Sequence, residues 1–202
     1  MNYNNFCKQI ENYVTGIFEK AHNPNLVYHD LTHTKTVVER SKEIAEHYHL
    51  SERDMMILWA AAWFHDTGHL FTDTAHHEEK SVQVMKEFMA SNNNEAELTP
   101  EIESAILSTK APRHPGNLLQ QILCDADTYH FGTEEFFLTD GLVKREFEER
   151  TTQKYHHWTE HTLRVLQKHE FYTSYCQTRL NSGQEKNISI LQEKIRDSSQ
   201  EI

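Results

Sequence analysis

The sequence predicts an all-α protein, and its helix-breaking residues and its apolar periodicity both support that prediction. The chain of 202 residues contains only six glycines and four prolines. Its apolar residues mostly recur every three or four positions, which is the period of a helix, and no long stretch alternates apolar and polar residues as a strand would. Since this length suits one domain with a sizeable core, we expect a single compact helical bundle over residues 1–202 with additional C-terminal helices.

The first two helices are predicted to lie in the first quarter of the chain. The first covers residues 3–20. Thr32 is placed to cap the second helix, which runs to about His49. His33 precedes Val37, an apolar residue of the inner face, by four positions, so the two side chains share that face near the start of the helix.

A third helix is expected to be buried. Ser51 is placed to cap it, and residues 55–64 are apolar nearly all round, which is typical of a helix in contact with protein on every side. The helix is predicted to end at His65 and Asp66, with Gly68 as a suitable stop. Two polar side chains at the end of a rigid buried helix are well placed to be held still.

Seven further helices are predicted from similar spacing. The connections with the clearest turn signals are the loops Asn92–Asn94 and Pro112–Pro115. The Lys- and Glu-rich tail beyond Ser182 is expected to fray. The further helices cover residues 75–91, 100–109, 117–130, 134–149, 152–168, 170–182 and 186–198.

The charge of the chain excludes one class of partner. With 31 acidic and 20 basic residues, the net charge is −11, which argues against general nucleic-acid binding because that binding rests mainly on Lys and Arg neutralising phosphates. A small phosphorylated substrate is still compatible with this charge, since a bound metal ion supplies local positive charge.

The cysteines and the N-terminus predict a cytoplasmic protein that does not enter a membrane. The three cysteines are odd in number and far apart, so a disulfide framework is not expected and a reducing compartment fits. Residues 1–11 contain no apolar signal core, and no apolar run approaches the ~18 residues of a spanning helix. The sequence carries no signal for the oligomeric state. The cysteines are Cys7, Cys124 and Cys176.

Two short strings and one later carboxylate carry the chemistry of the chain. The strings are Tyr28–Thr34, which contains His33, and Phe64–Gly68, which contains an adjacent His-Asp pair. Together with Asp127 they form a set of two imidazoles and two carboxylates, which suits Mn²⁺, Fe²⁺, Ni²⁺ or Co²⁺ and is compatible with Zn²⁺ or Mg²⁺. A His-Asp pair taken alone can equally be a surface dipeptide or a satisfied core hydrogen bond.

Residues 28–132 resemble the HD superfamily of metal-dependent phosphohydrolases, whose pattern is a His, then His-Asp, then a distant Asp on an all-helical scaffold. The resemblance implies core motifs over 28–132 and a helical extension over 133–202. It is strengthened by a His-Glu-x-x-Ser segment at 77–81, which part of the superfamily carries. The residues that match the ligand pattern, and that would hold one divalent ion, are His33, His65, Asp66 and Asp127.

Three points about the ion remain alternatives. Periodicity does not choose between Asp125 and Asp127, which lie near opposite edges of their helix, but the resemblance favours the second. His29 is either a partner of a ligand or a helix-entry residue. His76, His77 and Glu78 either contact a second ion or form a solvated first turn, where a Glu is favoured by the helix dipole. A single ion is expected, because Thr109 and Lys110 replace a position where some members offer His.

The catalytic and substrate-binding residues are predicted from their nearness to these motifs. Besides Asp66, which would act through the ion, the candidate proton donors are His69, Asp73 and Glu78. Arg forks match phosphate oxygens, so the loop that carries Lys110 and Arg113 is a candidate phosphate clamp, although ordinary surface charge explains it as well. The remaining candidate substrate-binding residues are His77, Lys144 and Arg145.

The function expected from the resemblance is metal-dependent hydrolysis of a phosphate monoester or diester, in particular that of a nucleotide. A bound ion would polarise a phosphoryl oxygen and lower the pKa of a coordinated water. Two alternatives belong to other classes: a di-iron oxygenase of the HD type, and a non-catalytic module that senses a nucleotide. The incomplete second ligand set disfavours the first, and the complete set of four disfavours the second.

Overall fold

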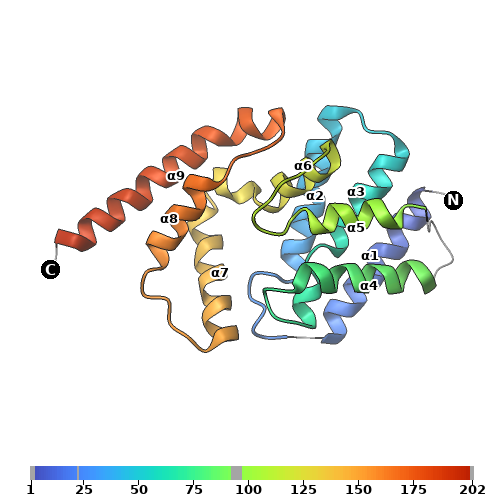
Figure 1. Cartoon of the computed structure of the whole chain (residues 1–202), viewed down its shortest axis with the longest axis horizontal. Helices are drawn as coiled ribbons and strands as arrows, with labels where there is room; N and C mark the ends of the chain where they lie inside the picture. The colour runs from blue at the N-terminus through green and yellow to red at the C-terminus, as the bar shows by residue number, and fades with distance from the viewer. Residues whose placement is uncertain (1–2, 22, 92–96, 201–202) are drawn as a thin grey trace. The chain divides into compact units, whose positions relative to one another are not determined.

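The computed structural model describes residues 3–21, 23–91 and 97–200, and the regular structure within them is entirely helical (Figure 1). The predicted all-α class is therefore confirmed. The chain divides into two compact units, Met1–Asp127 and Thr128–Ile202, and the expectation of one domain with a core over 28–132 stays a prediction. No helix in the described ranges is both long and apolar enough to span a membrane.

The first unit is built around its third helix. This helix, α3, contacts α1, α2, α4, α5 and α6, which explains why its sequence is apolar nearly all round. Burial of each large apolar side chain contributes about 1.5–3 kcal/mol, and three consecutive alanines, Ala60–Ala62, are almost fully buried among them. The elements of this unit are α1 (Tyr3–Ala21), α2 (Leu31–Tyr48), α3 (Glu52–Phe64), the 3₁₀ turn η1 (Thr67–Leu70), α4 (His77–Ser91), α5 (Thr99–Leu107) and α6 (Leu118–Asp127).

The starts of α2 and α3 are fixed by side-chain caps. Ser51 caps α3 as predicted, and its Oγ accepts from the backbone N of Asp54 at 3.1 Å. The prediction that Thr32 caps α2 was wrong. The cap is Asp30, whose Oδ1 accepts from the backbone N atoms of Thr32 and His33 at 2.7 and 2.9 Å. A carboxylate satisfies two free N–H groups there and also interacts favourably with the helix dipole.

The end of α3 is joined to α4 by a close backbone approach at Gly68. The helix ends at Phe64, with His65 as its C-cap, so Gly68 lies in η1 beyond the stop that it was predicted to form. Its N–H donates to Ser81 Oγ at 2.8 Å, and a Cβ added to it would lie 1.9 Å from the carbonyl oxygen of His77. Only glycine fits here, and this contact holds the segment after His65 against the start of α4.

The second unit packs around a small apolar cluster of Phe136, Leu166 and Leu191. The helix predicted over 117–130 stops at Asp127, where the first unit ends, and the turn η2 begins at Tyr129. The helix predicted over 152–168 begins only at Trp158, because Thr152 takes a left-handed conformation that ends α7. The elements are the 3₁₀ turn η2 (Tyr129–Gly132), α7 (Phe136–Thr151), α8 (Trp158–Lys168) and α9 (Ser174–Gln200).

The last helix corrects another prediction. The two helices expected over 170–182 and 186–198 are one helix, α9, and the tail beyond Ser182 is helical. Gly183 lies within this helix and permits close packing, since a Cβ there would lie 1.9 Å from the carbonyl oxygen of Gly132. Asn187 Nδ2 donates to the carbonyl oxygens of Phe131, in η2, and of Thr133, just after it, each at 3.0 Å, which ties the middle of α9 to that turn. The predicted loop Pro112–Pro115 is confirmed, and Asn92–Asn94 lies outside the described residues.

We expect Gly183→Ala to lower the free energy of unfolding, because the added methyl group meets a backbone carbonyl that cannot move aside. The expected loss is about 1–3 kcal/mol, as for overpacked interiors. Gly141→Ala is the matched control, since Gly141 also lies in a helix of this unit and has no atom within 4 Å of its added Cβ. It should gain about 0.5–1 kcal/mol from helix propensity. Denaturant unfolding followed by circular dichroism measures both, and equal stability of the two variants would contradict the packing role of Gly183.

Candidate metal centre

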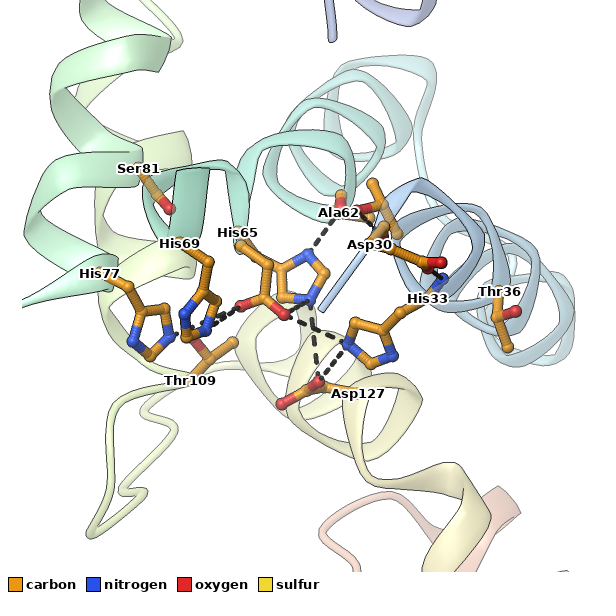
Figure 2. Close-up of polar contacts among 12 residues, drawn as sticks. Asp30, His33, Thr36, Ala62, His65, His69, His77, Ser81, Thr109 and Asp127 are labelled. Atoms are coloured by element: carbon orange, nitrogen blue, oxygen red, sulfur yellow. Dashed lines mark hydrogen bonds and ion pairs between the residues drawn. The ribbon is translucent and has the colours of Figure 1, made fainter. Parts of the chain in front are cut away.

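Four donor side chains from separate segments of the first unit converge (Figure 2). His33 lies in the first turn of α2, His65 and Asp66 follow the end of α3, and Asp127 is the last residue of α6. Their ligand atoms all lie within 4.8 Å of one another. The structure therefore brings together the four residues that the sequence motifs singled out, and Asp125 is not among them.

The distances in this group join each imidazole to both carboxylates. His33 Nε2 lies 3.2 Å from Asp66 Oδ2 and 3.2 Å from Asp127 Oδ1. His65 Nε2 lies 3.3 Å from Asp66 Oδ2 and 3.7 Å from Asp127 Oδ1. Two nitrogens and two oxygens therefore surround one small volume.

The tautomer of His65 suits a metal ligand. Its Nδ1 donates to the carbonyl oxygen of Ala62 at 2.8 Å, so in the neutral ring Nε2 presents a lone pair. The Nε2 atoms of His33 and His65 are both buried and make no hydrogen bond within the described residues. Imidazole nitrogens that face carboxylate oxygens in a buried space hold either protons or a cation, and a divalent ion with mixed nitrogen and oxygen ligands suits this donor set.

The pKa values show how strongly these groups are coupled. Burial alone lowers the pKa of His33, but Asp127 and Asp66 outweigh it and raise the pKa to about 9. The same opposition raises the pKa of His65 to about 10. Burial alone raises the pKa of each aspartate, yet both are held well below the usual value, mainly by the charge of His65 at Asp66 and by that of Arg113 at Asp127.

Arg113 is hydrogen-bonded to one of the four donor residues. Its Nη2 donates to Asp127 Oδ2 at 2.5 Å and its Nε to the carbonyl oxygen of Thr109 at 2.9 Å. One oxygen of Asp127 is thereby taken by the guanidinium, while the other faces His33 and His65. Lys110, the other residue of the predicted phosphate clamp, forms an exposed ion pair with Glu79. Contact of either residue with substrate stays a prediction.

A second group of donors lies beside the first and was not predicted as a group. It consists of His29, Asp66 and His69, whose ligand atoms also lie within 4.8 Å of one another. The rings of His29 and His69 stack with centroids 4.2 Å apart, and His77 stacks on the other face of His69 at 3.9 Å. A sequence signal existed in the four-residue spacing that pairs His29 with His33 and His65 with His69.

The other candidate catalytic residues differ in how far they are buried. Glu78 is buried, and one of its oxygens lies 3.3 Å from His77 Nδ1. That Nδ1 also donates to the carbonyl oxygen of Thr74 at 2.8 Å, and His77 Nε2 lies 3.5 Å from Asp66 Oδ1. Asp73 is exposed, and its Oδ1 accepts from His76 and from the backbone N of Ala75, so it orders the approach to α4.

Lys144 and Arg145 belong to the second unit. They pair with Glu148 and Glu149 of their own helix, α7, at 3.9 and 2.7 Å. These are pairs four residues apart on one helix, a kind that contributes only about 0.3–0.5 kcal/mol at an exposed surface. A role in substrate binding stays a prediction for both.

A protein-family model described as the HD domain matches residues 30–132. The match covers half of the chain, begins at the residue that caps α2 and includes all four donors. Searches of curated proteins and of solved structures found no match. The four converging donors therefore all lie within the part of the chain that the family model matches.

We expect metal binding near neutral pH to release protons, because His33 and His65, with pKa values of about 9 and about 10, must lose theirs to become ligands. Up to about two protons per ion should appear. Isothermal titration of Mn²⁺ in buffers of different ionisation enthalpy counts them, and the apparent affinity should rise with pH.

In the metal-free protein, the stability from these imidazolium–carboxylate pairs is fully present below the ordinary histidine pKa of about 6.5. It is lost as the pH rises through about 9 and about 10. Proton-free binding would contradict these charge states.

We expect Arg113→Ala to weaken metal binding, since Asp127 loses the partner that orients it. Loss of such a supporting contact typically costs about 10–100-fold in metal affinity. Lys110→Ala is the matched control from the same loop, and its affinity should be unchanged because its exposed pair with Glu79 lies outside the donor group. Competition with a chelating dye measures both constants. Equal affinities would show that Arg113 does not position the carboxylate.

Proposed function

Since this chain belongs to the HD-domain family, we propose that it is a metal-dependent phosphohydrolase that cleaves a phosphate monoester or diester, in particular that of a nucleotide. HD domains are generally metal-dependent hydrolases. The observation that carries the proposal is the group of four donors, which is compatible with metal binding. The choice of a nucleotide rests on the resemblance of the motifs and is the narrower part of the proposal.

The four donors would hold one divalent ion in this proposal. Two imidazoles and two carboxylates suit Mn²⁺, Fe²⁺, Ni²⁺ or Co²⁺, and Zn²⁺ and Mg²⁺ are compatible. When bound, such an ion polarises a phosphoryl oxygen and lowers the pKa of a coordinated water. The buried Nε2 atoms of His33 and His65, which have no hydrogen-bond partner within the described residues, support this assignment.

The protein groups next to Asp66 would bind the substrate and move the proton. Burial lowers the pKa of His77, but Asp66 outweighs it and raises the pKa above its ordinary value. A histidine whose pKa is raised keeps its proton to higher pH, which suits both contact with a phosphate oxygen and donation to the leaving-group oxygen. His69 and Glu78 both contact His77 and share this role, whereas Asp73 stays the candidate farthest toward solvent.

The substrate would approach a negatively charged protein, so local positive charge has to attract it. Arg113 neutralises Asp127, and Lys110 neutralises Glu79. Both pairs lie in the first unit together with the donors. The three cysteines are odd in number and far apart in the sequence, which supports the further proposal that the protein works in the reducing cytoplasm.

A di-iron oxygenase is the second candidate function. It is favoured by the second donor group, His29, Asp66 and His69, because an oxygenase of this kind would hold two irons. Hydrolysis differs from oxidation in needing neither oxygen nor an electron acceptor, so one experiment separates the two reactions.

We expect the protein to hydrolyse at least one phosphate ester without oxygen when Mn²⁺ is added. The assay screens nucleotides and cyclic nucleotides anaerobically and identifies phosphate or a nucleoside monophosphate as product. His65→Ala removes a donor of the proposed ion. Loss of a residue that only supports a donor costs about 10–100-fold in activity, so loss of the donor itself should lower the rate by at least about a hundredfold. His76→Ala is the control, since this exposed histidine lies next to His77 in sequence but outside both donor groups.

Two results would overturn the proposal. Turnover that requires oxygen, together with bound iron, would assign the oxygenase function. Saturable nucleotide binding without any product would assign the sensing module.

A further inference from the structure

The last of the four donors lies where a helix is least rigid. Asp127 is the final residue of α6, and helix ends fray because their last carbonyl groups lack partners within the helix. Arg113 holds the carboxylate of Asp127. The backbone that carries the carboxylate must be held as well if the group is to stay beside His33 and His65. The contacts of the next residue, Thr128, therefore decide how firmly this donor is fixed.

Thr128 is hydrogen-bonded to a histidine that lies 41 residues later in the chain. Its side chain is almost fully buried, and its Oγ1 lies 2.9 Å from Nε2 of His169, the C-cap residue of α8. Gln184 decides the direction of this bond. Its Nε2 donates to the carbonyl oxygens of Leu166 and His169, both at 2.9 Å, so its Oε1 faces His169 Nδ1, at 3.4 Å. Nδ1 therefore carries the proton, and Nε2 accepts from the hydroxyl of Thr128.

The ring of His169 is held in this orientation by two aromatic neighbours. Its centroid lies 4.9 Å from that of Phe131 and 4.6 Å from that of Phe171, with interplanar angles of 77° and 80°. Edge-to-face contacts of this kind are favourable for aromatic rings, and Phe171 is itself almost fully buried. Together with the bond to Gln184 they leave the lone pair of Nε2 directed at Thr128.

The turn η2, which Thr128 begins as its N-cap, is also fixed farther along. The carbonyl oxygen of Thr128 accepts from the backbone N of Phe131 at 2.9 Å. Gly132 packs closely on Gly183 of α9, and Asn187 donates to the carbonyl oxygen of Phe131. These contacts all lie within the second unit, and Thr128 is joined to Asp127 by the chain itself.

We propose that Thr128 and His169 are positioning residues of the metal centre, whose hydrogen bond fixes the backbone directly after Asp127 and so holds the last donor in place. The proposal rests on the proposed function, because it takes Asp127 as a ligand of the divalent ion. Neither residue belongs to the group of four donors, so both act through Asp127. The second unit thereby contributes to metal binding although it supplies none of those donors.

The first test measures Mn²⁺ affinity of the full-length chain by competition with a chelating dye. Thr128→Val removes the hydroxyl and keeps the shape of the side chain, and should weaken binding about tenfold, the lower end of what loss of a supporting contact costs. Thr128→Ser keeps the hydroxyl and should bind as the unaltered chain does. Thr162→Val is the matched control, since this buried threonine of the second unit donates to Asp140 at 2.8 Å, and its affinity should be unchanged.

A double-mutant cycle tests whether the two residues act through one bond. His169→Phe keeps a ring between Phe131 and Phe171 and removes both nitrogens, so it should also lose about tenfold in affinity. The double variant of Thr128→Val and His169→Phe should lose no more than either single variant, because the same bond is already absent. If His169→Phe fails to fold, the three threonine variants decide the question by themselves.

The second test needs no metal. Hydrogen exchange of the metal-free chain reports local opening, and the amides in the last turn of α6 should exchange about tenfold faster in Thr128→Val, the same free energy expressed as an opening equilibrium. They should be unchanged in Thr128→Ser and in Thr162→Val.

Three results would overturn the proposal: unchanged affinity in Thr128→Val, unchanged exchange in that variant, or an equal loss of affinity in Thr162→Val. An unaltered chain that binds no Mn²⁺ would instead count against the proposed function, and the exchange rates alone would then decide whether this bond fixes Asp127.

Discussion

The candidate site depends on the neutralisation of two carboxylates that are removed from water. Taking a carboxylate into the protein interior costs several kcal/mol unless opposite charges and hydrogen bonds compensate. Asp66 and Asp127 meet that requirement through His33, His65 and Arg113. A divalent ion compensates the same charges more completely, so proton and metal compete for one place.

The scaffold positions these charges through contacts made elsewhere. The cap of α2 by Asp30 fixes the backbone N of His33, and the carbonyl of Ala62, in the last turn of α3, fixes the ring of His65. Close packing at Gly68 then sets where the chain goes after Asp66. The apolar packing of α3 stabilises the framework on which all of these contacts rest.

The carboxylate of Asp66 lies between two pairs of histidines. His33 and His65 lie on one side of its carboxylate, and His69 and His77 lie on the other. Arg113, which the sequence suggested as a phosphate contact because it lies in a basic loop, pairs with Asp127. Its contact with a substrate stays a prediction.

The sequence by itself determined the helical class, the buried nature of α3 and three of the four converging donors, His33, His65 and Asp66. These features depend on local periodicity and on short motifs, and both are set by residues that are neighbours in the sequence. Periodicity left Asp125 and Asp127 as alternatives, and only the tertiary structure brought Asp127 to His33 and His65. The tertiary structure also decided the partner of Arg113, the grouping of His29 with His69, and the continuity of α9 through Gly183. Each of these depends on the distance between segments remote in sequence. Helix packing sets that distance, and local propensity contains no information about it.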